Sequence, residues 1–167
     1  MPTGKNKVPM AQLRQVLTDE GFSNVRTWIQ SGNVVLETEI SPQETEEKVH
    51  HLILKYIGPD LVSVVRTGDE LTQVIDENPF AKGYDISRVF FALFKETPAK
   101  DKIAKLLRCV LSPEKLAITD KAAYMYIPGT YGRGKLSSNY LEKQLGVGVT
   151  MRNFNTMTKL IELSKEQ

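Results

Sequence analysis

The first third of the chain changes from helical to alternating spacing of its apolar residues. Apolar positions recur every three or four residues over 10–17, and Gly21 follows them, which predicts a first helix ending before that glycine. Over 25–30 every second residue is apolar, and a Ser-Gly-Asn turn leads into the apolar run 34–37. This pattern predicts a β-hairpin.

A second helix is predicted from Ser41-Pro42, because proline fits the first turn of a helix. Its inward stripe is predicted to be Val49, Leu52, Ile53 and Tyr56. Gly58-Pro59 ends this helix, the β-branched run 61–65 predicts a strand, and 69–76 predicts a short helix.

The second half of the chain repeats the same order of elements with one strand added in front. The apolar run 88–94 predicts a central strand. After it we expect a helix at 100–110, strands at 115–119 and 122–127, a helix at 136–145, a strand at 147–152 and a last helix at 156–164 with Asn155 as its N-cap.

These elements predict an α+β chain of two ferredoxin-like (βαββαβ) subdomains in tandem, 1–83 and 84–167, plus a C-terminal helix. The first subdomain reads αββαβ and therefore lacks its N-terminal strand. That strand would lie inside a sheet of order 4-1-3-2. Its absence would leave 61–65 detached, so we expect a first sheet that is gapped, rearranged or completed by a partner.

Composition narrows the class of protein. About two-fifths of the 167 residues are apolar and no stretch approaches the roughly 20 apolar residues of a membrane span, so we expect a cytoplasmic protein with no membrane contact. The single cysteine, Cys109, excludes an internal disulfide and is expected to be a buried or half-buried, inert thiol.

The net charge of +2 is unevenly distributed. Residues 1–83 carry 8 basic and 12 acidic side chains, whereas 84–167 carry 14 basic and 8 acidic ones. The basic half would suit an anionic ligand, or the two halves would attract one another in a homodimer. Charge alone favours neither interpretation.

Three phrases of the sequence resemble one known family. They are GKNKVPMAQLRQVLTDEGFSNVRTWIQSGNVVLET, YGRGKLSSNYLEKQLGV and TMRNFNTMTKLIEL, in that order. They are similar to a bacterial family of uncharacterised proteins, domain of unknown function (DUF) 1697. The resemblance implies two ferredoxin-like subdomains and no activity. Members open with a strand similar to YIALLRGINVGG, which here shrinks to residues 1–4, so we expect a truncation or a misplaced gene start.

The glycine-rich segment YIPGTYGRGKLSSN is the sharpest local motif. Gly129, Gly134 and Lys135 match most of a phosphate-binding P-loop, but Leu136 stands where a hydroxyl must bind Mg²⁺. The sequence therefore disfavours an NTPase. A weaker anion site at a helix start remains open, and so does a solvated turn without a ligand.

The predicted binding surface combines this loop with the turn before the last helix. Two helix starts in 130–159 offer free N–H groups, and basic residues outnumber acidic ones there. The candidate ligand-binding residues are Gly132, Arg133, Lys135, Arg152, Asn153 and Asn155, with Lys5 and Asn6 as the matching loop of the first subdomain.

Other constellations are weaker. Trp28, Tyr124 and Tyr126 could stack RNA bases on the sheets, but the RNA-binding signature is absent and packing between the subdomains is favoured. The pairs Glu46–His50 and Glu47–His51 are predicted to be surface pairs, not metal ligands. No metal, cofactor or catalytic set is nominated.

The leading hypothesis is therefore binding of an anionic small molecule or a nucleic acid through the basic loop. One alternative is a small-molecule enzyme with a pocket between the subdomains for a phosphate-bearing substrate. The other is a homo-oligomeric interaction protein. The sequence leaves open whether the chain is an enzyme.

Overall fold

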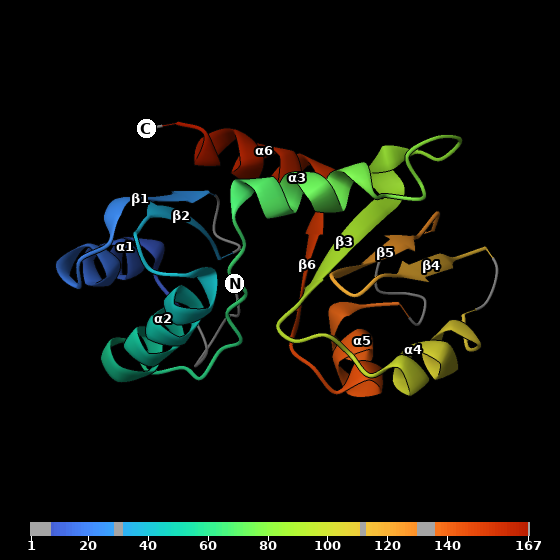
Figure 1. Cartoon of the computed structure of the whole chain (residues 1–167), viewed down its shortest axis with the longest axis horizontal. Coiled ribbons are helices and arrows are strands. Elements are labelled where there is room, and N and C mark those ends of the chain that lie inside the picture. Colours follow the sequence, from blue (N-terminus) through green and yellow to red (C-terminus); the bar gives the residue numbers. More distant parts are fainter. Residues whose placement is uncertain (1–7, 29–31, 111–112, 130–135, 167) are drawn as a thin grey trace. The chain divides into compact units, whose positions relative to one another are not determined.

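The computed structural model describes residues 8–28, 32–110, 113–129 and 136–166 and shows an α+β fold (Figure 1). Within these ranges there are six α-helices, a two-stranded sheet and a four-stranded sheet. The elements are α1 (Met10–Asp19), β1 (Ser23–Trp28), β2 (Asn33–Glu37), α2 (Pro42–Tyr56), α3 (Gly68–Asp76), the 3-10 turn η2 (Ile86–Arg88), β3 (Val89–Phe94), α4 (Lys100–Leu107), β4 (Lys115–Ile118), β5 (Ala122–Tyr126), α5 (Ser138–Leu145), β6 (Val149–Asn153) and α6 (Phe154–Ser164).

The chain divides into two compact units. Unit 1 comprises Met1–Asp69 and Lys159–Gln167, and unit 2 comprises Glu70–Thr158, so the division falls inside α3 and α6. The boundary predicted after residue 83 stays a prediction, because grouping by contact does not show which segments fold independently. No helix in the described ranges is long and apolar enough to cross a membrane.

Unit 2 contains the four-stranded sheet, with strand order β4-β5-β3-β6. The central strand β3 pairs antiparallel with β5, Val89 opposite Tyr126, and antiparallel with β6, Phe90 opposite Asn153. Strand β4 lies at one edge and pairs with β5, Lys115 opposite Tyr126. The order of helices and strands and the central place of 89–94 are as predicted.

Helices cover both faces of this sheet. On one face, alternate residues of the strands pack against α4 and α5 in a core that includes Ala92, Met125, Leu106 and Leu141. The other alternate residues face α3 and the start of α6, which lie on the opposite side of the sheet in Figure 1. A strand buried on both faces reads as a continuous apolar run, which explains the sequence VFFALF of β3.

Unit 1 contains the hairpin β1–β2, and one face of it packs on α1 and α2. Gly21, with a φ of 102°, ends α1 as predicted, and Ser41 caps α2 by accepting a hydrogen bond from the N–H of Glu44. The core of this unit is a cluster of buried residues from the two helices and the segments beside them: Val8, Met10, Leu13, Leu17, Phe22, Leu52 and Ile53. Val25, Val34 and Leu36 of the hairpin pack against it.

The prediction of a strand at 61–65 is wrong. This segment belongs to no sheet of the described residues, although Leu61 packs on the core of unit 1 and Val62 is half exposed. Its β-branched residues favour extended backbone, but a strand also needs a partner to pair with. The expected detachment of 61–65 from a gapped first sheet is what the described residues show.

Three smaller expectations are also wrong. Tyr56 does not point inward but is 47% exposed at the end of α2. Cys109 is exposed just beyond α4, where we expected a buried or half-buried thiol. The expected Glu46–His50 surface pair fails because Glu46 is buried and His50 Nε2 lies 2.5 Å from Asp60 Oδ1.

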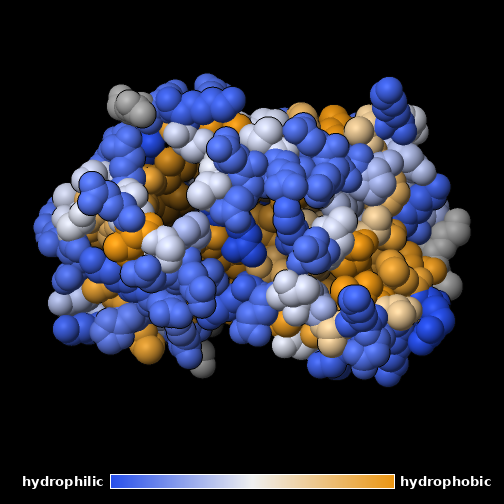
Figure 2. Space-filling model, in the orientation of Figure 1, coloured by the Kyte–Doolittle hydropathy of each residue, from blue (hydrophilic) through white to orange (hydrophobic). Residues whose placement is uncertain are grey.

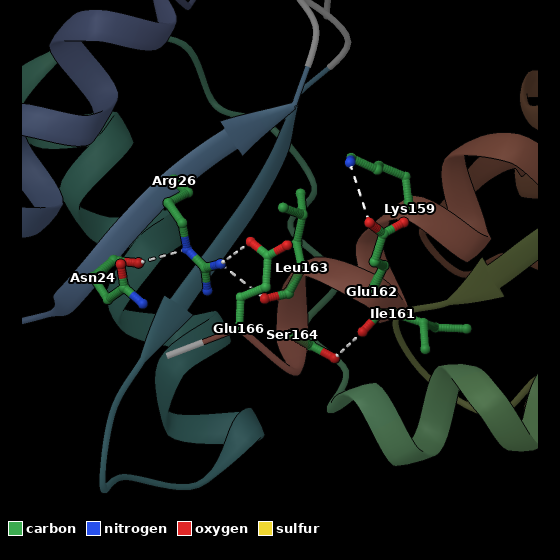
Figure 3. Close-up of polar contacts among 8 residues, drawn as sticks. All are labelled: Asn24, Arg26, Lys159, Ile161, Glu162, Leu163, Ser164 and Glu166. Carbon is green, nitrogen blue, oxygen red and sulfur yellow. Dashed lines mark hydrogen bonds and ion pairs between the residues drawn. The ribbon is translucent and has the colours of Figure 1, made fainter.

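Within unit 1, the last turns of α6 lie against the other face of the hairpin (Figure 3). Arg26 on β1 donates from Nη1 to the carbonyl oxygen of Leu163 at 2.8 Å and lies 3.6 Å from Glu166 Oε2. The ammonium group of Lys159 lies 5.0 Å from the ring centre of Trp28. An arginine is well suited to this place, since carbonyl oxygens at a helix C-terminus lack partners and carry partial negative charge.

Candidate functional site

One end of the unit 2 sheet gathers basic and aromatic side chains. Because neighbouring strands are antiparallel, the starts of β3 and β4 meet the ends of β5 and β6 there. Lys115, Tyr126 and Val89 form one row across three strands and point to the same face. We call this region the basic sheet end and define it by Tyr84, Arg88, Lys115, Tyr126 and Gly129.

The glycine-rich loop begins and ends at buried residues. Ile127 and Leu136 are both 2% exposed, and the first follows β5 directly at the basic sheet end. Burial of Leu136 explains why an apolar residue replaces the hydroxyl of a P-loop here. The predicted ligand-binding residues Gly132, Arg133 and Lys135, as well as Lys5 and Asn6, lie outside the described residues.

Two helices begin at this same end of the sheet. Helix α5 starts after the loop, and Ser137 caps it by accepting from the N–H of Tyr140 at 3.1 Å. Helix α6 starts directly after β6, and Asn153 Oδ1 accepts from the N–H of Thr156 at 2.8 Å. Both predicted helix starts thus lie at the same end of the sheet, one on each of its faces.

The predicted asparagines do not act as expected. Asn153, not Asn155, is the capping residue, because the helix begins two residues earlier than its apolar spacing suggests. Asn155 lies exposed in the first turn, and its carbonyl oxygen accepts from the hydroxyl of Thr158 at 3.0 Å. The side chain of Asn153 caps α6, whereas Asn155 contributes only its backbone carbonyl oxygen to the first turn.

Arg152 lies on the sheet and not in an open turn. It stands opposite the fully buried Phe91, on the face covered by α3 and α6. Its Nη1 donates to Thr150 Oγ1 and to the carbonyl oxygen of Met151, both at 2.8 Å. Burial lowers the pKa of Arg152. Its side chain is therefore less accessible than the sequence suggested.

Arg88 and Lys115 are exposed cations that the sequence analysis did not nominate. Arg88 Nη1 donates to the carbonyl oxygen of Gly129 at 3.3 Å, which places the guanidinium at the first residues of the loop. Lys115 Nζ donates to the hydroxyl of Tyr84 at 2.8 Å. A usable signal existed for Lys115, because the pairing of the two predicted strands places it near Tyr126.

Glu114 directly precedes Lys115 in the chain, and another acidic residue close to the cations in sequence is Asp85, three residues before Arg88. Its carboxylate accepts hydrogen bonds from the Ser87 hydroxyl at 2.7 Å and from the Ser87 N–H at 3.0 Å, and these bonds lower its pKa. The carboxylate is thus occupied in shaping the turn before β3 and does not pair with Lys115.

The aromatic residues of the sheet separate into a buried and a half-buried group. Tyr124 is fully buried and donates to the carbonyl oxygen of Val74 on α3 at 2.6 Å. The sheet face around it is therefore covered by α3 of the same unit, and packing between the subdomains stays a prediction. Tyr126 lies one row further out, half-buried, with its ring 4.8 Å from that of Tyr84.

Metal chemistry has no support in the described residues. No group of three or more histidine, cysteine, aspartate or glutamate side chains comes together there, and His50 and His51 contribute to none.

Comparisons with known proteins bear on family and fold. A family model described as "Protein of unknown function (DUF1697)" matches residues 2–124. The structure of the conserved bacterial protein SP0830 from Streptococcus pneumoniae is similar over 97% of this chain and 92% of that chain, with a TM-score of 0.75 and 22% identity. No curated protein matches the sequence. The structural likeness shows a shared fold.

Proposed function

The chain belongs to the DUF1697 family, for which the family description states no function, and we propose that it binds a phosphate-bearing anion, a nucleotide or nucleic-acid phosphate, at the basic sheet end of unit 2. The observation that carries the proposal is the contact of exposed Arg88 with Gly129 at the start of the glycine-rich loop, with exposed Lys115 bonded to Tyr84 at the same end of the sheet.

Physical chemistry supports an anion at this place. Two helices start there, and the partial positive charge of a helix start favours negative groups. The loop between Ile127 and Leu136 contains Arg133 and Lys135 and no acidic residue, so its sequence adds positive charge beside Arg88. A cationic surface of this kind attracts phosphate through charge and through N–H donors.

We also propose that both halves derive from one ferredoxin-like plan. The order β4-β5-β3-β6 in unit 2 is the strand order of that plan, and α1, β1, β2 and α2 follow the same sequence of elements as α4, β4, β5 and α5. The basic sheet end belongs to the unit with four strands, where two neighbours of β3 hold the strand ends in place.

The test is binding of inorganic phosphate, mononucleotides and short single-stranded DNA and RNA at increasing salt. We expect affinity to fall as salt rises, and Arg88→Ala with Lys115→Ala to weaken binding about tenfold or more, as expected for lost charge-assisted hydrogen bonds. Lys121→Ala is the matched control, because Lys121 is an exposed lysine in the turn before β5, at the opposite end of the sheet.

A second arm tests the loop with Arg133→Ala and Lys135→Ala, for which we expect the same direction of change. Equal losses with Lys121→Ala would point to nonspecific attraction and contradict a site. The proposal is also wrong if no phosphate compound binds in a salt-sensitive way.

A further inference from the structure

Three aromatic rings form a cluster beside the cations of the basic sheet end. The ring of Tyr84 meets Phe80 at 5.1 Å and 70° and Tyr126 at 4.8 Å and 67°, and both contacts are edge-to-face. An edge-to-face contact uses at most one face of a ring. Phe80 is buried beneath, whereas Tyr84 and Tyr126 are partly exposed.

Lys115 is the cation of the basic sheet end that contacts this aromatic cluster. Its Nζ lies 2.8 Å from the Tyr84 hydroxyl and 5.0 Å from the centre of the same ring, so the ammonium sits at the oxygen end of the ring and not over its face. The cation and the partly exposed ring thus lie side by side. This arrangement suits a ligand that has a negatively charged part and a flat apolar part.

The surrounding surface is not a purely charged one. Figure 2 shows apolar surface over the part of unit 2 where β4 and β5 lie in Figure 1. A ligand recognised by phosphate alone would gain nothing from an apolar aromatic surface, whereas an aromatic base stacks on such rings and is sequence-tolerant in doing so.

We propose that the ligand of the basic sheet end is a mononucleotide, whose base stacks on Tyr84 while its phosphate is held by Lys115 and Arg88; Tyr126 contacts Tyr84 edge-to-face and fixes the orientation of that ring. This inference rests on the proposed function and adds the chemical class of the ligand. The two tyrosines distinguish a nucleotide from a simple phosphate ester, and the two cations supply the attraction common to both.

The experiment compares adenosine monophosphate, ribose 5-phosphate and inorganic phosphate by isothermal titration at fixed salt. We expect the nucleotide to bind wild-type protein about tenfold or more tightly than ribose 5-phosphate, the lower part of the range for a base stacked on an aromatic side chain. In Tyr84→Leu this preference should fall to about twofold or less.

Tyr84→Phe is the matched control, because it keeps the ring and removes the hydroxyl that accepts from Lys115. It should retain the preference for the nucleotide. The melting temperature of each variant shows whether the aromatic cluster still folds, and Tyr126→Leu provides a second route to the same result if Tyr84→Leu unfolds.

The outcomes separate the two proposals. Equal affinity for the nucleotide and for ribose 5-phosphate, with Lys115-dependent binding of both, would overturn the mononucleotide and leave the anion site intact. Tighter binding of a single-stranded oligonucleotide than of any mononucleotide would also overturn it, in favour of a nucleic acid. Absence of all phosphate binding would overturn both.

Discussion

In unit 2 the strand β3 lies between β5 and β6 and is covered by helices on both faces, whereas in unit 1 the hairpin β1–β2 has no further strand paired with it among the described residues. Both units share the motif of a hairpin framed by two helices. The difference is two strands, β3 and β6, and with them the rows of backbone hydrogen bonds that fix the strand ends.

This comparison explains why the candidate site lies in unit 2. A binding surface needs side chains held in one geometry, and rigid sheet positions hold them better than loops do. At the basic sheet end, Lys115 and Tyr126 are held by the cross-strand register to β3. In unit 1 the hairpin β1–β2, which corresponds to β4–β5, has no such central strand beside it among the described residues, and the run 61–65, which corresponds to β6, is in no strand.

The largest expected effect comes from shortening a buried side chain of the central strand β3. Phe91 is fully buried and its ring contacts those of Tyr124 at 5.9 Å and Phe154 at 6.3 Å. Phe91→Ala should lower the free energy of unfolding by about 3–5 kcal/mol through lost burial and a cavity. Val35→Ala in the half-buried hairpin should cost about 1 kcal/mol or less. Urea denaturation measures both, and similar losses would remove the contrast between the sheets.

A smaller loss is expected at a close approach within unit 1. A Cβ added at Gly68, the first residue of α3, would lie 2.2 Å from Ser164 Oγ and 3.0 Å from Ser164 Cβ. Gly68→Ala should therefore cost about 1–3 kcal/mol, as overpacking typically does. Adding Ser164→Gly should recover most of it in the double variant. Gly129→Ala is the control, since nothing lies within 4 Å of its Cβ position.

The buried hydroxyl of Tyr124 should give unit 2 a dependence on alkaline pH. Burial, with a further contribution from the charge of Glu77, raises the pKa of Tyr124 to about 12 from 10.0. Folding thus favours the neutral phenol, and its stabilisation is complete below pH 10 and lost as the pH rises toward 12.

Tyr124→Phe should lower stability at pH 7 by about 1–2 kcal/mol, because the carbonyl oxygen of Val74 loses its donor. The variant should also lose stability less steeply between pH 10 and pH 12. Denaturation curves at several pH values measure both effects. Parallel pH profiles for wild type and variant would contradict the buried hydrogen bond.

The smallest expected effect concerns the end of α6 in unit 1. Arg26→Ala removes the donor to the Leu163 carbonyl oxygen and the ion pair with Glu166, and should cost about 1 kcal/mol. Arg26→Lys should restore part of it. Amide hydrogen exchange should show faster exchange in the last turn of α6 only, and unchanged rates there would mean that the contact does not hold the helix.

Most elements of the fold were predictable from local signals. The continuous apolar run of β3 indicated a central strand, and Gly21 and Ser41-Pro42 marked helix boundaries, because each depends on residues close in sequence. The run 61–65 was mispredicted because pairing with a strand far along the chain decides whether a β-branched segment becomes a strand. Tyr56 was mispredicted because helical spacing does not show where the core beside a helix ends.

The candidate site was only partly predictable. The loop and the start of α6 were found because glycine and basic residues beside helix starts are visible in sequence. Arg88 and Lys115 were missed, since only the register of β3, β5 and β4 brings them to the end of one sheet. Asn153 was predicted to bind the ligand, but it caps α6. The sequence pattern does not show which of the two asparagines lies at the start of the helix.

The most direct test of the central claim is an amide chemical-shift map of the whole chain during titration with adenosine monophosphate at low salt. We predict that the largest changes in amide chemical shift occur at Tyr84–Val89, Lys115, Tyr126–Gly129 and the first turn of α6. The shifts of the hairpin 23–37 should stay unchanged. Changes centred on that hairpin, or none anywhere at millimolar nucleotide, would contradict a binding site at the basic sheet end.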